Sequence, residues 1–245
     1  MKATEQFPNV DVFQRLDMIV QKAAFYGFRL IVTLNDLPDL DNYPLYDNPT
    51  HIQLQTAFII NRYKHEPAIL AWDVRNEGDI DYGTHHAIPA KSTKDQVLNW
   101  LAATTDAIRQ LDSNHLLTAG WLYTAELTAP YVDFVSFHHW TSADELVSRV
   151  NTLRQFTDKP ILLQEFGYST GRVSPEEQAT LMLQVIQTSE AQQLLGWMIW
   201  TAFDFPIDRS CYPSPCQSPN NGEHYFGIWT VDTMPKPAYF AIMER

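Results

Sequence analysis

Residues 68–77, Ala-Ile-Leu-Ala-Trp-Asp-Val-Arg-Asn-Glu, decide how this chain is interpreted. They form an apolar run of strand length that ends in the carboxylate of Glu77. A second run, Pro-Ile-Leu-Leu-Gln at 160–164, ends in the same way at Glu165. Short apolar runs bounded by polar residues are typical of buried strands in parallel sheets. A carboxylate at the end of such a run is costly to bury, so we expect both glutamates to have a chemical role.

Composition limits the possible functions. The chain has 245 residues, of which 45% are hydrophobic and 19% charged, so it can bury a sizeable core. Its length is close to the roughly 250 residues of a single α/β barrel. The net charge of -12 argues against a nucleic-acid partner, because phosphates favour a basic surface. There is no apolar run of transmembrane length, and residues 1–6 lack the apolar segment of a signal peptide, so no membrane partner is expected.

The two cysteines leave the redox compartment open. Cys211 and Cys216 lie in the segment Cys-Tyr-Pro-Ser-Pro-Cys, where they could form a small disulfide loop. Two reduced thiols in a cytosolic loop fit the sequence equally well.

Helical and strand patterns alternate along the chain, which indicates an α/β fold with parallel strands in one domain, residues 1–245. On the first helix, one side should carry Val12, Leu16, Ile19, Val20 and Ala23. The third, fourth and fifth helices should be capped by Ser92, Ser142 and Ser174. The predicted helices are 10–26, 49–63, 92–111, 142–156, one that opens at 174–177, and 236–244. The predicted strands are 29–34, 68–75, 115–119, 132–137, 160–164 and 196–200. Six strands would suit either an open doubly wound sheet or a barrel with six of its eight units.

Polar residues follow five of these strands. They are Asn35-Asp36, Asn76-Glu77, His138-His139, Glu165 and Thr201. Active sites of α/β barrels are built at the carboxyl ends of the strands. Together, the five ends predict a site at that edge of the sheet.

From about Val10 onward, the chain resembles the clan A glycoside hydrolases, most closely the cellulase and mannanase type of family five. Residues 72–77 match the fourth strand of that family, and 160–167 its seventh. Residues 134–138, Phe-Val-Ser-Phe-His, are similar to the sixth strand, and 198–200, Met-Ile-Trp, to the eighth. The resemblance implies a (β/α)8 TIM barrel, here partial, with about six of the eight units.

The resemblance also assigns roles. It implies that Glu77 is the acid/base, which must carry a proton at rest, and that Glu165 is the nucleophile. Their carboxyl groups are then expected about 5–5.5 Å apart, as in retaining enzymes. It further implies substrate-binding positions at Asn76, which would hold the sugar 2-hydroxyl, and at Asn35, His138, Trp140 and Trp200. Neither a cofactor nor a metal is expected.

The chain departs from the family pattern in three ways. Gly78 stands where the family usually has Pro after Asn-Glu, and Trp140 where it usually has Tyr. The first two strands of the family, with the Arg on the second, have no counterpart. We therefore expect an N-terminally incomplete barrel whose strands 29–34 and 196–200 leave open edges, with weak activity and self-association through those edges.

Several other residues have two possible readings. Trp121, Trp140, Trp200, Trp229 and Tyr168 could stack on sugars, although core packing is as plausible for Trp121 and Trp229. Asp204 and Asp208 could bind hydroxyl groups, but a solvated loop is the expected environment for both. Asp73 is expected to make a hydrogen bond inside the core.

The sequence therefore predicts a retaining β-glycosidase acting on a β-linked glucan, mannan or related oligosaccharide. One alternative is a catalytically silent truncated barrel that binds carbohydrate. Another is a metal-dependent hydrolase using Asp36, His138 and His139, which is disfavoured because adjacent strand residues point to opposite faces. No signal peptide is visible, but the family resemblance implies an extracellular protein.

Overall fold

The computed structural model describes residues 10–36, 38–42, 44–48, 53–83, 89–208 and 220–245. The chain divides into two structural units, residues 1–136 and 137–245. The single catalytic domain expected from the sequence stays a prediction. Cys211 and Cys216 lie outside the described residues.

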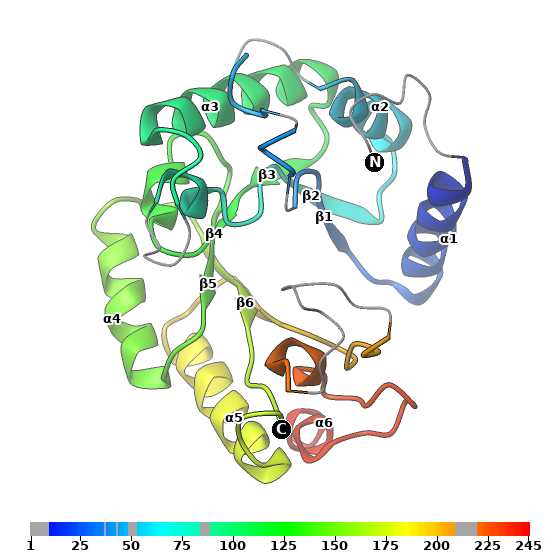
Figure 1. Cartoon of the computed structure of the whole chain (residues 1–245), viewed down its shortest axis with the longest axis vertical. Coiled ribbons are helices and arrows are strands. Elements are labelled where there is room, and N and C mark those ends of the chain that lie inside the picture. The colour runs from blue at the N-terminus through cyan, green and yellow to red at the C-terminus, as the bar shows by residue number, and fades with distance from the viewer. Residues whose placement is uncertain (1–9, 37, 43, 49–52, 84–88, 209–219) are drawn as a thin grey trace. The chain divides into compact units, whose positions relative to one another are not determined.

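The first unit is built on a three-stranded parallel sheet (Figure 1). Its strands are β1 (Leu30–Thr33), β2 (Ile69–Asp73) and β3 (Leu116–Thr118), in the order β1-β2-β3. Thr33 is level with Asp73, and Asp73 with Thr118, so all three strands end at one edge. The three predicted strands are therefore confirmed, with slightly shorter bounds.

The helices of this unit are α1 (Val10–Tyr26), α2 (Leu54–Tyr63) and α3 (Lys94–Leu111). The chain also forms a two-residue strand, β4 (Gly120–Trp121), and two short 3-10 helices, η1 (Gly78–Tyr82) and η2 (Ala125–Thr128). These three short elements were not predicted. They have too few residues to show a hydrophobic period.

The predicted ends of α1 are confirmed, but the predicted face is wrong in part. Phe13, Val20 and Ala23 are the buried residues, whereas Val12 is 49% and Ile19 55% exposed. Phe13 and Val20 are seven residues apart, which places them on one stripe of the helix. Val12 and Ile19 precede them by one position and so lie beside that stripe.

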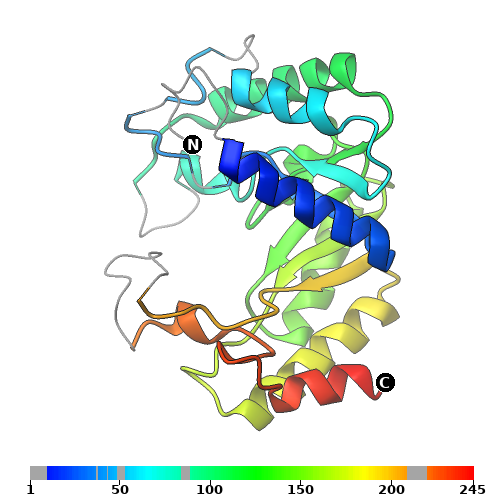
Figure 2. The same cartoon turned by 90° about the vertical axis from the view of Figure 1, so that its right-hand side faces the viewer.

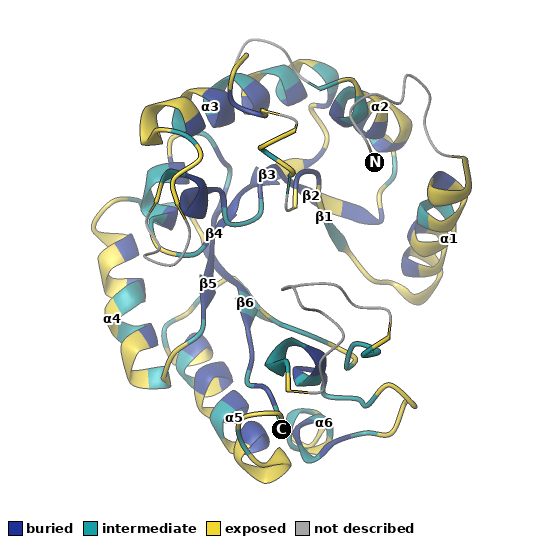
Figure 3. Cartoon of the chain, in the orientation of Figure 1, coloured by how far each residue is buried: buried dark blue, intermediate teal, exposed yellow. Residues whose placement is uncertain are grey.

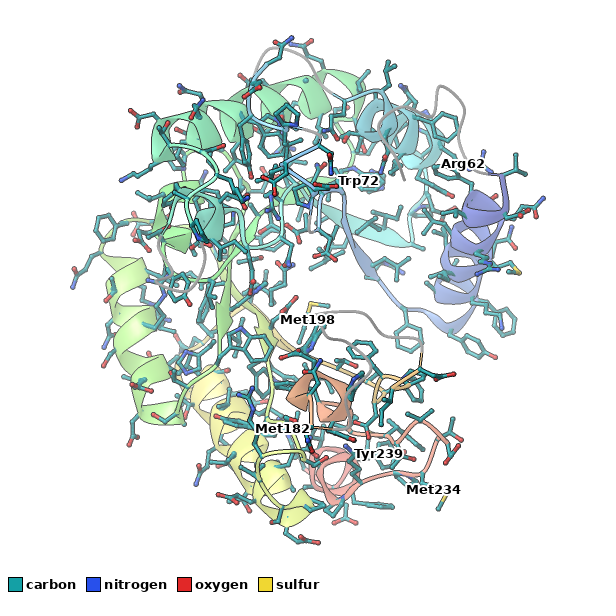
Figure 4. All side chains as sticks on the ribbon, viewed as in Figure 1. Arg62, Trp72, Met182, Met198, Met234 and Tyr239 are labelled. Carbon is teal, nitrogen blue, oxygen red and sulfur yellow. The ribbon has the colours of Figure 1, made fainter. Side chains whose placement is uncertain are left out.

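Helix α1 is also joined to α2 by polar contacts. Arg62, labelled in Figure 4, extends from α2 toward α1 and pairs with Asp17. The phenol of Tyr63 donates to the same carboxylate at 2.6 Å.

The sheet of the second unit contains β5 (Val135–His139), β6 (Ile161–Phe166) and β7 (Gly196–Ile199), which are hydrogen-bonded neighbours in that order. β5 begins at the end of the first unit, and β6 and β7 pair in parallel. The strand predicted at 132–137 is in fact 135–139, because Asp133 turns away and its carboxylate accepts the Leu117 amide at 2.6 Å. β6 continues through Glu165, and β7 ends just before Trp200. In Figure 3, β5 and β6 are almost wholly buried.

Three helices cover this second sheet. They are α4 (Ala143–Arg154), α5 (Pro175–Ala191) and α6 (Pro237–Met243), with a 3-10 helix, η3 (Gly222–Tyr225), between α5 and α6 in the chain. α5 packs against α4 on one side and α6 on the other (Figure 1), and Figure 2 shows α6 beside α5. Met182 of α5 is fully buried (Figure 4). β7 is the last strand of its sheet, as β1 is of the other, but self-association through these edges stays a prediction.

Two of the three predicted helix caps are confirmed. Ser142 and Ser174 are the N-caps of α4 and α5. The prediction of Ser92 is wrong by one residue, because Thr93 caps α3. Its hydroxyl accepts the Gln96 amide at 3.2 Å, and the Gln96 side chain accepts the Thr93 amide at 2.9 Å. The Ser92 amide donates instead to the Asp81 carbonyl.

A buried polar cluster joins β2 to the end of α3. Trp72, labelled in Figure 4, is fully buried and donates its indole N–H to Asp112 at 2.8 Å. The Nδ1 atom of His115 lies 2.7 Å from the same carboxylate oxygen, and its Nε2 atom 3.0 Å from the Glu66 carbonyl oxygen. Burial alone raises the pKa of the Asp112 carboxyl, but the hydrogen bonds from Trp72 and His115 outweigh it and hold the pKa below its usual value.

Among the described helices, none combines the length and the apolar character needed to cross a membrane.

Replacing Thr93 by Ala should lower the free energy of unfolding by about 1 kcal/mol, because the Gln96 amide at the start of α3 loses the hydroxyl that accepts it. Ser92→Ala, one residue earlier, is the matched control and should change it by less than about 0.5 kcal/mol. Urea denaturation of both variants measures the difference. The reverse order of effects would contradict the cap assignment.

Asp112→Asn should lower the free energy of unfolding by about 2 kcal/mol at pH 7, because hydrogen bonds to a charged acceptor are lost. The folded pKa of Asp112 is depressed, so its contribution is present above the unfolded value near 3.9 and lost as the pH falls through the folded value. The difference from the parent chain should therefore shrink below about pH 4. Denaturation across pH measures it, with the exposed Asp106→Asn as control. A difference that does not vary with pH would contradict the assignment.

Candidate active site

Glu77 lies four residues beyond the end of β2, where the backbone makes an unusual turn. Its φ of 47° and ψ of 40° are left-handed. A non-glycine residue in this region costs on the order of 1–3 kcal/mol and persists only where the surroundings hold it. Here the Glu77 amide donates to the Gly120 carbonyl at 2.7 Å, and the Asn76 amide to the Asn35 carbonyl at 3.0 Å. Neighbouring strand ends thus fix the backbone that leads into this residue.

The two asparagines predicted to bind substrate have different environments. Asn35 is buried, and its side-chain amide donates to the Val74 carbonyl at 3.0 Å. This bond holds the end of β1 to the chain that follows β2. Asn76 is half-buried, and its amide donates to Asp36 at 3.0 Å. The structure brings Asn35, Asp36, Asn76 and Glu77 together at one edge, while their contact with a sugar stays a prediction. Asp73 makes the core hydrogen bonds expected of it, from Thr33 at 2.9 Å and Gly120 at 3.1 Å.

Behind this edge lies a buried guanidinium that sequence reasoning missed. Arg75 is 1% exposed and donates to Asp81 at 2.7 Å, to the Tyr46 hydroxyl at 3.1 Å and to the backbone carbonyls of Asp36 and Asn76. Burial raises the pKa of Tyr46, whose phenol donates to Asp81. The signal in the sequence was a charged residue inside an apolar strand pattern, which is rare unless the charge is paired.

Gly78 and Asp79 complete the turn after Glu77. A Cβ atom on Gly78 would lie 2.8 Å from Cγ of Arg75 and 3.0 Å from Nε1 of Trp121, so a larger residue does not fit without rearrangement. This accounts for Gly where the family pattern has Pro. Asp79 is fully buried, and its carboxylate accepts the amides of three successive residues, 122–124. Burial raises the pKa of Asp79, and the nearby charge of Glu77 adds to that increase.

In the second unit, Glu165 lies on β6 beside His138 of β5. Nδ1 of His138 is 3.5 Å from a carboxylate oxygen of Glu165. The His138 side chain is fully buried, whereas that of Glu165 is 19% exposed. The buried histidine therefore limits the movement of the Glu165 carboxylate on its inner side, while the outer side of the carboxylate stays open to solvent.

His139 has a separate role from His138. Its Nε2 atom is 2.8 Å from the Ser142 carbonyl oxygen, to which it can donate, at the start of α4. Burial lowers the pKa of His139, which favours the neutral ring. Since the two rings have different partners, this unit does not offer them together to one metal ion.

The aromatic residues divide into two groups. Trp140 and Trp200 are half-buried. The Trp140 ring packs edge-to-face on Phe226 with the ring centroids 5.6 Å apart. The Trp200 ring is tilted against Phe205 with the centroids 5.8 Å apart. Both keep exposed surface that a sugar could contact. In contrast, Trp121 is completely buried and belongs to the core. The other two also have protein partners: Trp229 packs on Tyr239, which is labelled in Figure 4, at 4.4 Å, and the Tyr168 hydroxyl donates to the Thr141 carbonyl at 2.7 Å.

The end of β7 is held close to the end of β6. A Cβ on Gly167 would lie 2.1 Å from the Trp200 carbonyl oxygen, so only glycine permits this approach. The peptide bond between Trp200 and Thr201 is cis.

The expectation of a solvated loop is wrong for Asp204. Its side chain is 8% exposed and pairs with Lys236 at 2.7 Å. Lys236 also donates to the Thr170 hydroxyl at 2.9 Å and the Tyr225 carbonyl at 3.2 Å. This buried cluster ties the segment after β7 to the segment after β6. Asp208 is exposed, as expected.

Comparisons with known proteins show the family and the fold of this chain. Residues 88–213, just over half of the chain, match the model of the family "Glycosyl hydrolase catalytic core". Mannan endo-1,4-beta-mannosidase A of Podospora anserina is 26% identical over 207 residues, which cover 67% of this chain and 53% of that protein. The chain spans about half the length of the curated relatives it matches.

Solved structures share the fold. The GH5_18 structure from Streptomyces cattleya in complex with GlcNAc matches with a TM-score of 0.81 at 17% identity, over 99% of this chain and 67% of that one. A variant of GH5_18 from the same organism, in complex with Manβ1-4GlcNAc, gives a TM-score of 0.78 at 16% identity, over 99% and 68%. The α/β fold is therefore that of these barrel proteins. The chain belongs to the glycosyl hydrolase catalytic core family, and the family-five-like character indicated by its strand ends is confirmed.

Proposed function

We propose that this chain carries the catalytic residues of a retaining glycoside hydrolase that cleaves β-linked mannosides. The observation that carries the proposal is the placement of two glutamates at strand ends. Glu77 follows β2 in a backbone conformation that its surroundings impose, and Glu165 lies on β6, partly exposed, beside buried His138. The Glu77 backbone and the Glu165 carboxylate are each held within their own unit, which restricts where the two acidic groups can lie.

The reaction follows from these two groups. Glu165 attacks the anomeric carbon as a carboxylate, and Glu77 donates its proton to the departing oxygen. Water then enters, Glu77 takes a proton from it, and the bond between sugar and Glu165 is cleaved with net retention. His138 restrains the nucleophile through its Nδ1 atom. Asn76 would contact the 2-hydroxyl, and Trp140 and Trp200 would pack on sugar faces.

The substrate class rests on the relatives. The Podospora protein is named a mannan endo-1,4-beta-mannosidase, and one GH5_18 structure holds Manβ1-4GlcNAc. We therefore narrow the glucan or mannan expected from the sequence to β-1,4-linked mannosyl units. The half-buried Trp140 and Trp200 fit a ligand with apolar ring faces. The barrel of about six units stays part of this proposal.

A second candidate is a chain that binds carbohydrate without cleaving it. It would use the same half-buried indoles of Trp140 and Trp200, together with Asn76. A mechanism-based 2-deoxy-2-fluoro mannoside separates the two, because only a working nucleophile forms the covalent adduct.

The chain incubated with that reagent should gain the mass of one glycosyl group on the peptide that contains Glu165. Glu165→Ala should remove both the label and turnover of an aryl β-mannoside, and added azide should restore part of the turnover as a glycosyl azide. Glu176→Gln, on the exposed first turn of α5, is the control and should behave like the parent chain. Saturable binding of mannooligosaccharide without any label would favour the silent alternative.

Glu77→Ala should slow poor leaving groups far more than activated ones, by about 100-fold or more against a few-fold, because a dinitrophenolate departs without protonation. Values of kcat/KM across a series of aryl β-mannosides measure this. Equal losses across the series would contradict the role of Glu77 as acid.

A further inference from the structure

Arg75 is the one basic residue of the β2 segment, residues 68–77, and the proposed mechanism does not use it. Its side chain is 1% exposed, and its three nitrogens have four partners in separate parts of the first unit. Nε donates to Tyr46 and Nη2 to Asp81, at 3.1 and 2.7 Å. Nη1 donates to the backbone carbonyls of Asp36 and Asn76. A guanidinium in this position is tolerated because every face of its fork is paired.

One of these acceptors belongs to the peptide group that leads into Glu77. The carbonyl of the Asn76–Glu77 peptide accepts from Arg75, and its N–H donates to the Gly120 carbonyl at 2.7 Å. Both polar ends of this one peptide are therefore fixed. The backbone torsions that follow this peptide are the left-handed φ of 47° and ψ of 40° of Glu77, a conformation that residues other than glycine seldom adopt.

We propose that Arg75 is a positioning residue for the acid/base. By holding the peptide before Glu77, with Asp81 and Tyr46 fixing the guanidinium from behind, it keeps the Glu77 carboxyl aimed at the glycosidic oxygen. This proposal rests on the proposed role of Glu77. Gly78 leaves room for the Arg75 side chain, because a Cβ atom on residue 78 would lie 2.8 Å from Cγ of the arginine.

A purely structural ion pair would look similar in the fold but behave differently in kinetics. If Arg75 only stabilises the unit, its replacement should slow all substrates alike. If it positions the proton donor, its replacement should reproduce in weaker form the leaving-group dependence of Glu77→Ala. Lys at this position keeps the charge near Asp81 but lacks the fork that reaches the two carbonyls.

The test uses Arg75→Lys in the full chain, with aryl β-mannosides of graded leaving-group acidity. We expect kcat/KM to fall by about 10- to 100-fold on poor leaving groups and by only a few-fold on the dinitrophenyl mannoside, as a small misplacement of a catalytic group can cost this much. Arg109→Lys is the matched control. It alters another Arg–Asp pair of the same unit, with Asp133, and should give a uniform, small change. A uniform loss for Arg75→Lys, or none, would overturn the proposal.

A second measurement does not depend on turnover. Amide hydrogen exchange at Glu77 should accelerate at least 10-fold in Arg75→Lys relative to Arg109→Lys, while exchange in β2 stays the same in both. If the parent chain shows neither turnover nor label, the proposed function fails, but this exchange still decides the role of Arg75. Unchanged exchange at Glu77 would overturn the positioning role even in an active enzyme.

Discussion

The first unit depends on the parallel pairing of β2 with a strand on each side. Hydrogen bonds from β1 and β3 place Thr33, Asp73 and Thr118 level with one another. This register brings the residues after the three strands to one edge. The Asn76 amide can then meet the Asn35 carbonyl, and the Glu77 amide the Gly120 carbonyl. A shift of one residue would exchange the faces of β2 and place the Trp72 side chain on the opposite side. The conformation of Glu77 is therefore a consequence of strand register.

Polar groups in this unit are buried in connected sets. Asp112 accepts a hydrogen bond from Trp72 and lies beside His115. Asp79 accepts hydrogen bonds from three backbone amides. Asp81 accepts hydrogen bonds from both Tyr46 and Arg75. Each carboxylate is removed from water but has partners of the opposite polarity, which is the condition under which burial is tolerated. Such sets are directional, so they restrain the backbone more tightly than apolar contacts would. The candidate acid lies between two of them.

The sequence predicted the regular elements well because they are long and periodic. All six strands and the described parts of the six helices were found where the apolar patterns placed them, with ends shifted by at most three residues. Residues 49–52, where the second helix was predicted to begin, lie outside the described part of the chain. The errors arose where the pattern carries no information. Val12 and Ile19 lie one position away from the buried stripe of α1, and Thr93 and Ser92 are equally good caps until the turn before them is known. The elements β4, η1 and η2 depend on tertiary hydrogen bonds, such as those of Asp79, that local sequence does not encode.

The candidate site was predicted to the extent that its residues follow strands. Glu77, Asn76, His138 and Glu165 could be named from the strand ends, whereas the contacts of Arg75 and the buried environment of Asp204 could not be predicted. Their importance lies in partners that are distant in the chain, 29 residues away for Tyr46 and 32 for Lys236. Trp121 shows the reverse case: its position beyond a strand fits a sugar platform, but full burial places it in the core.

The cluster around Lys236 affects how this part of the molecule can change over evolution. Lys236 bonds to Thr170 and Asp204, so it closes the segment between residues 204 and 236 at its base. The entropy lost on closing a loop grows only with the logarithm of its length. Insertions or deletions in the part of this segment between Phe205 and His224, whose backbones are joined by a hydrogen bond of 3.0 Å, therefore add little to the free energy of holding the base together. The segment can acquire new side chains near Trp200 while the strands stay unaltered, which makes it a place where members of such a family can diverge in what they recognise.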